Sequence, residues 1–90
     1  MLTIKEMPLS ERPRERFLKY SSEMIQTHEL IAIIMRTGTK NESVLDLSKR
    51  VFYQYDDVKE LSNASIVDLM KIKGIGESKA ISLKAAFELG

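Results

Sequence analysis

Hydrophobic residues recur along this chain at the spacing of helices, and the strict alternation typical of strands is nearly absent. One stripe at i, i+3 and i+4 predicts a helix over 28–36, with Thr27 as its N-cap. A second stripe predicts a helix that begins at 41 or 42 and ends at Tyr53. Between the two, Gly38 is the residue that can take a positive φ and so end the first helix. The predicted core positions of these helices are Leu30, Ile33, Ile34, Val44, Leu47, Ser48 and Val51.

The N-terminal part of the chain predicts a lead-in and one helix. Residues 1–9 place apolar side chains around Pro8 and are typical of extended chain. Ser10 is expected to start a helix that runs to about Ser21, with Pro13 tolerated because it falls in the first turn. The charges of this helix alternate in sign, and we expect pairing within the helix rather than a nucleic-acid patch from Glu11, Arg12, Arg14, Glu15 and Arg16.

The C-terminal part predicts three further helical segments. A short helical turn is expected around 58–61, and Ser65 is expected to cap a helix that ends near Lys71. The last predicted helix spans 77–89. Its apolar side consists of Ala80, Leu83 and Phe87. Residues 10–90 therefore predict a single all-α domain of five or six short helices.

The second half of the chain repeats the apolar pattern of the first when the sequence is shifted by 36 positions. Gly38 then falls on Gly74, and apolar positions of the flanking helices coincide. The repeat defines a degenerate first hairpin over 27–53 and a second hairpin over 65–89, each with two helices around a glycine-containing turn. Two such hairpins side by side would bury one shared core that neither can close alone.

The turn of the second hairpin carries the chemistry. Gly74 and Gly76 let the backbone turn tightly, and Ile75 between them is expected to point into the core. Gly76 leads directly into the last predicted helix, whose first amides lack an intrahelical acceptor and can bind a phosphate oxygen. Lys73 and Lys79 flank the turn and add positive charge. We therefore predict contacts to a phosphate backbone from these five residues.

The Gly-apolar-Gly turn, followed by three residues and then by Ala80, resembles the helix-hairpin-helix DNA-binding motif. Residues 11–16, 29–39 and 43–44, with 71–76 at similar spacing, resemble the N-terminal region of the bacterial RadC family. The resemblance covers nearly the whole chain. It implies a tandem helix-hairpin-helix bundle of the RuvA type, whose hairpin amides bind DNA backbone phosphates without reading sequence. The family's name also associates it with DNA repair, which no residue here shows.

The same resemblance implies that this chain is a fragment of a longer protein, in which a metallopeptidase-like domain of the JAB/MPN type follows. This leaves an alternative function open. The Gly74–Gly76 turn then only joins two helices, and the domain is a protein-interaction or structural module that positions the downstream domain without binding DNA. The first hairpin departs from the motif, because it has threonines around Gly38 and lacks the apolar residue and the second glycine of the motif. It supplies a possible second DNA contact, consisting of Arg36, Thr37, Gly38, Thr39 and Lys40.

Composition limits the function without choosing it. The 90 residues carry 14 Lys and Arg against 13 Asp and Glu, for a net charge of +1. The basic excess lies over 36–50 and over 69–87, where Lys71 and Lys84 add to the turn lysines, so DNA binding is expected to be weak and non-specific. The chain has no cysteine, which favours the cytoplasm, and its longest apolar runs are too short to span a membrane. With one histidine, His28, and no nucleophile beside a base, we expect no catalysis, metal site or cofactor in this chain.

Overall fold

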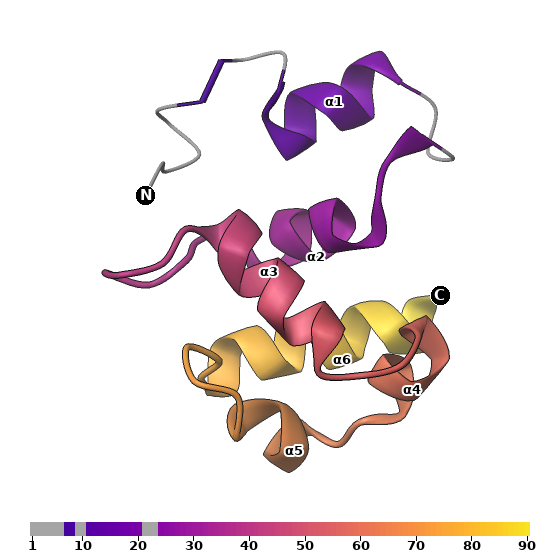
Figure 1. Ribbon diagram of the computed structural model, residues 1–90. Coiled ribbons are helices and arrows are strands. Elements are labelled where there is room, and N and C mark those ends of the chain that lie inside the picture. The colour runs from indigo at the N-terminus through magenta and orange to yellow at the C-terminus, as the bar shows by residue number, and fades with distance from the viewer. Residues whose placement is uncertain (1–6, 9–10, 21–23) are drawn as a thin grey trace.

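The computed structural model describes residues 7–8, 11–20 and 24–90, and every regular element in these ranges is helical (Figure 1). The helices are α1 (Pro13–Lys19), α2 (Thr27–Met35), α3 (Val44–Tyr53), α4 (Val58–Asn63), α5 (Ile66–Met70) and α6 (Glu77–Leu89). The all-α prediction is therefore confirmed for the described residues. The predicted lead-in over 1–9, apart from Met7 and Pro8, and the predicted helix ends at Ser10 and Ser21 lie outside the described residues.

Two helices begin directly after a serine whose side chain caps the helix N-terminus. The Ser65 hydroxyl accepts the Asp68 N–H at 3.0 Å, which confirms Ser65 as the cap of α5. In α3 the Ser43 hydroxyl accepts the Asp46 N–H at 3.2 Å, so this helix begins at Val44, later than predicted. The chain before Ser43 is instead used in a tight loop.

One predicted helix cap is wrong. Thr27 is the first residue of α2 rather than its cap, because the Glu29 carboxylate accepts the Gln26 N–H at 3.1 Å and makes Gln26 the cap position. Helix α1 begins at Pro13, with Arg12 as its cap position. A proline suits the first helical position, since it has no N–H to leave unpaired there.

The core lies where α2, α3, α5 and α6 pack together, with α4 against α6 (Figure 1). The predicted stripe of α3 is confirmed, because Val44, Leu47, Ser48 and Val51 are all buried. The buried Ser48 hydroxyl donates to the Val44 carbonyl at 2.6 Å, so its polar group is satisfied inside the helix. Ala80 and Leu83 on α6 are also fully buried, as predicted, and Phe87 is half-buried against the core.

Helix α2 buries a different face from the one predicted. Its core residues are Ile31, Ala32 and Met35. The predicted positions, Leu30, Ile33 and Ile34, are only half-buried and line an apolar groove against α1 with Phe17 and Leu18. Because residues 30–35 are all apolar, the helix is apolar on nearly every side and its periodicity does not single out one face.

Helix α1 is held on α2 by an ion pair between helices. The Arg16 guanidinium donates to the Glu29 carboxylate at 2.6 Å, and Glu29 is 7% exposed. Arg16 therefore pairs with α2, and the prediction of pairing within its own helix is wrong for this residue. Its guanidinium also lies 5.3 Å from the centre of the Tyr20 ring.

Candidate nucleic-acid interface

The two predicted contact regions lie side by side. The α5–α6 turn packs against the α2–α3 loop, because a Cβ placed on Gly74 would lie 3.2 Å from Thr39 Cγ2 and 3.1 Å from Leu47 Cδ1. The Lys79 ammonium donates to the Thr37 hydroxyl at 3.3 Å, across the two hairpins. Residues more than 30 positions apart in the sequence thus form one surface, which we call the two-turn face: Thr37, Thr39, Lys73, Gly74, Gly76 and Lys79.

The second turn has the geometry that its glycines predict. Gly74 takes φ +97°, a conformation that other residues rarely adopt. Ile75 is 4% exposed and lies in the core, as predicted, while its N–H donates to the Ile72 carbonyl at 3.0 Å. Gly76 is the N-cap position of α6 and is exposed. A Cβ on Gly76 would meet none of the described atoms within 4 Å, so the fold itself does not require a glycine there.

The first turn is built differently, and the prediction for Gly38 is wrong. The residue with positive φ is Arg36, at φ 73°, where backbone strain costs about 1–3 kcal/mol. Gly38 is required for close approach instead, since its Cβ would lie 2.2 Å from the Glu42 carbonyl oxygen and 2.6 Å from the Val44 nitrogen. The loop closes behind it, where the Thr39 N–H donates to the Glu42 carbonyl at 2.9 Å.

The predicted second contact is divided by the structure. Thr37 and Thr39 adjoin the second turn, and Lys40 is exposed in the same loop. Arg36 instead lines a depression of about 320 Å³ against α1, together with Arg12 and Arg14. It is therefore not part of the two-turn face.

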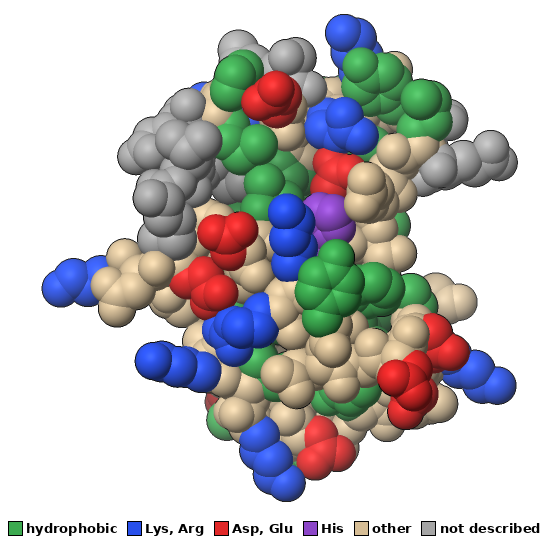
Figure 2. Space-filling view, in the orientation of Figure 1, with side chains coloured by type: hydrophobic (Ala, Val, Ile, Leu, Met, Phe, Trp, Pro, Cys, Tyr) green, Lys and Arg blue, Asp and Glu red, His purple; other side chains and the backbone are tan. Residues whose placement is uncertain are grey.

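The lysines of the second hairpin differ in what they contact. Lys73 is exposed, and Lys79 is half-buried with its ammonium on Thr37. Lys71 lies 3.5 Å from the Asp68 carboxylate, and Lys84 donates to the Ser62 carbonyl at 2.9 Å on the α4 side. The basic excess of this segment thus contributes two lysines, not four, to the two-turn face. Figure 2 shows basic side chains along the left of the molecule, where the loop and the turn lie, with acidic side chains among them.

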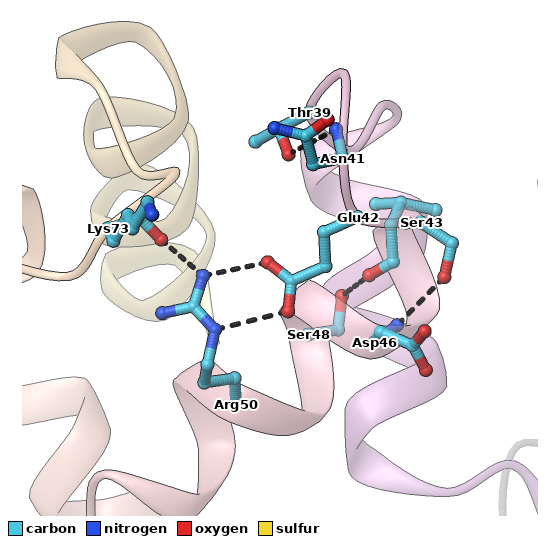
Figure 3. Close-up of polar contacts among 9 residues, drawn as sticks. Thr39, Asn41, Glu42, Ser43, Asp46, Ser48, Arg50 and Lys73 are labelled. Carbon is cyan, nitrogen blue, oxygen red and sulfur yellow. Dashed lines mark hydrogen bonds and ion pairs between the residues drawn. The ribbon is translucent and has the colours of Figure 1, made fainter. Parts of the chain in front are cut away.

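Arg50 is a residue of this region that the sequence did not single out. Its guanidinium donates to both oxygens of the Glu42 carboxylate, at 2.8 and 3.1 Å, and also to the Lys73 carbonyl (Figure 3). The hydrogen bonds from Arg50 lower the pKa of Glu42 below its ordinary value of 4.5. The basic excess over 36–50 pointed to this helix, but no sequence signal identifies partners 8 and 23 positions away.

No metal or membrane feature emerges from the described part of the chain. His28 is half-buried, and burial together with the nearby charge of Lys49 lowers its pKa below 6.5. Within 7–8, 11–20 and 24–90, no three His, Asp or Glu side chains gather as metal ligands do. Among the same residues, no helix has the length and apolar character needed to cross a membrane.

Comparison with known proteins places the chain in a bacterial group. A family model described as UPF0758 N-terminal matches residues 4–81. The UPF0758 protein YsxA of Bacillus subtilis (strain 168) is 52% identical over 89 residues, which cover 99% of this chain and 38% of YsxA. A UPF0758 protein of Staphylococcus aureus (strain Newman) is 48% identical over 89 residues, which cover 99% of this chain and 39% of the relative.

The chain therefore spans about two fifths of the length of the relatives it matches. No solved structure matches it. Since the family model matches residues 4–81, which is most of the chain, the chain belongs to the UPF0758 N-terminal family.

Proposed function

We propose that this domain binds DNA through backbone phosphates, without reading sequence, at the two-turn face. The observation that carries the proposal is Gly76. A side chain at this position would not clash with the described chain. Gly76 is also exposed and lies directly before the first amides of α6. The absence of a side chain there leaves these amides open to a bulky ligand. The resemblance of the turn to the helix-hairpin-helix motif adds support.

The chemistry of the turn suits a phosphate oxygen. The first N–H groups of a helix have no intrahelical acceptor, and the helix dipole places partial positive charge at the same end. Lys73 and Lys79 add two cations beside them, and the Thr37 hydroxyl lies within reach of Lys79. Because this site can bind only one or two phosphates, we expect weak DNA binding, with dissociation constants of roughly 10⁻⁴–10⁻⁶ M. The affinity should fall as the salt concentration rises.

One charge opposes this role. Glu77 is the first residue of α6 and is exposed beside the same amides. A carboxylate there stabilises the helix through the dipole, but it repels a phosphate. Binding by the natural sequence is therefore weaker than the amides and lysines alone would give.

Fluorescence anisotropy of a labelled duplex at low and moderate salt tests the proposal. The double variant Lys73→Glu and Lys79→Glu should lose binding. The matched control carries the same charge change on exposed lysines of α1 and α4, as Lys19→Glu and Lys59→Glu, and should retain most of it. A wild-type domain that does not bind at low salt would refute the proposal, as would equal losses in both double variants.

A different observation favours the alternative, a module that positions another domain of a longer protein. The apolar groove between α1 and α2 leaves Phe17 44% exposed and Leu18 86% exposed. With Leu30, Ile33 and Ile34 they line one apolar groove, and a contiguous exposed apolar surface commonly marks a contact with another protein. Titration of the isotope-labelled domain with the separately produced remainder of a longer relative distinguishes the two. Chemical-shift changes at Phe17 and Leu18 would support the alternative, and changes at 73–79 on adding DNA would support the first function.

A further inference from the structure

Arg50, on α3, connects the two turns through hydrogen bonds to both of them. On one side it holds the Glu42 carboxylate with two hydrogen bonds, at 2.8 and 3.1 Å. On the other it donates to the Lys73 carbonyl in the α5–α6 turn. The guanidinium is a planar, rigid fork, so fixing one edge on a carboxylate also fixes where the remaining N–H groups point. Figure 3 shows Arg50 between the two partners.

Glu42 is itself fixed within the first loop. Its carbonyl accepts the Thr39 N–H at 2.9 Å, and the next residue, Ser43, caps α3. The carboxylate that holds Arg50 therefore stands on a loop anchored at both ends. Its side chain is 25% exposed and that of Arg50 is 35% exposed, so the pair lies at the edge of the face rather than under it.

The hydrogen bond from Arg50 to the Lys73 carbonyl also determines where the next backbone N–H, that of Gly74, points. A peptide unit is planar and trans, so the N–H of Gly74 points opposite to the carbonyl of Lys73. By holding that carbonyl, Arg50 directs the Gly74 N–H away from itself. Gly74 is also close to the guanidinium, since a Cβ there would lie 3.4 Å from Arg50 Nη2.

We propose that Arg50 is a positioning residue of the phosphate site: braced by Glu42, it orients the Lys73–Gly74 peptide and keeps the two turns together as one binding surface. This inference rests on the proposed function. It assigns Arg50 a role through the backbone of its neighbour rather than as a direct cationic contact to DNA.

The variant Glu42→Gln separates positioning from simple electrostatics. It removes a negative charge near the face, so electrostatics alone would tighten DNA binding. Loss of this support for Arg50 should instead weaken DNA binding, by about three- to tenfold, the equivalent of one ordinary hydrogen bond. The matched control is Glu77→Gln, which removes the same charge from the start of α6 without touching Arg50, and it should tighten binding.

Anisotropy with the same duplex is measured for the wild type, for these two variants and for Arg50→Lys, which keeps the charge but loses the fork. Amide spectra report whether each variant is folded and whether the Thr39 and Gly74 signals move. The expected result is weaker binding by Glu42→Gln and Arg50→Lys, with moved Gly74 signals and tighter binding by Glu77→Gln. If the wild type binds and Glu42→Gln binds as well or better, this inference alone fails. If the wild type does not bind, the proposed function fails with it.

Discussion

The two hairpin turns of this domain have a glycine at one matching position, Gly38 and Gly74, yet they need it for different reasons. In the α2–α3 loop, Gly38 lets the chain pass against the backbone of Glu42 and Val44, while Arg36 takes the positive φ. In the α5–α6 turn, Gly74 takes the positive φ, and Gly76 has free space around it. Glycines at matching positions thus meet two separate structural requirements, close approach at Gly38 and a positive φ at Gly74. Gly76 meets neither requirement, and the proposed phosphate contact rests on this third glycine.

The largest expected effect is the loss of stability in the variant Gly38→Ala, which tests the close approach of two backbone segments. A Cβ on Gly38 would lie 2.2 Å from the Glu42 carbonyl oxygen, and backbone atoms cannot turn aside as a flexible side chain can. We expect Gly38→Ala to lower the free energy of unfolding by about 3 kcal/mol. Urea denaturation measures the change. A loss below that of Gly74→Ala would contradict the contrast between the two turns.

At Gly74 the cost is mainly conformational. The φ of +97° strains any residue with a Cβ, while the nearest atoms, on Leu47, Thr39 and Arg50, belong to side chains that can adjust. Gly74→Ala should therefore cost about 1–2 kcal/mol in the same denaturation experiment. It should also weaken DNA binding, because it disturbs the peptide that Arg50 holds.

Gly76 should show the opposite balance. Its φ of −91° is open to all residues, and a Cβ there meets nothing described within 4 Å. We expect Gly76→Ala to change stability by less than about 1 kcal/mol, chiefly through its N-cap position. DNA affinity should fall by more than stability does, since the methyl group enters the space assigned to the phosphate. Unchanged affinity in anisotropy would remove the main observation behind the proposed function.

The smallest expected effect is on the pH dependence of stability, through the carboxylate of Glu42. The pKa of Glu42 is lowered in the folded protein by its hydrogen bonds to Arg50. Its contribution to stability is therefore present above the ordinary value of 4.5 and is lost as the pH falls through the lower, folded value. Thermal unfolding between pH 6 and pH 3 should show a shallower acid loss for Glu42→Gln than for the wild type. Parallel curves of melting temperature against pH would indicate that the hydrogen bonds between Glu42 and Arg50 add little to stability.

Sequence reasoning succeeded where one signal acted alone. The stripe of α3 has polar residues on its other sides, so its buried face was predicted correctly, and the Ser65 cap and the buried Ile75 followed from local chemistry. It failed on α2, whose six consecutive apolar residues fit every face.

Contacts between distant segments were the other limit. Glu42, Arg50 and Lys73 come together only because the two hairpins pack against each other, and neither spacing nor charge indicates that pairing. The same holds for Lys79 and Thr37, which were predicted as members of separate contacts. Their grouping in one face is a property of the tertiary structure.

The carboxylate of Glu29 has a consequence for how the N-terminal region comes apart. One oxygen accepts the N–H of Gln26 and starts α2, while the other holds the guanidinium of Arg16 on α1. Because both contacts depend on the same buried group, undocking α1 also loosens the first turn of α2. The two helices should therefore open as one cooperative unit, and amide hydrogen exchange in the first turn of α2 should report the release of α1.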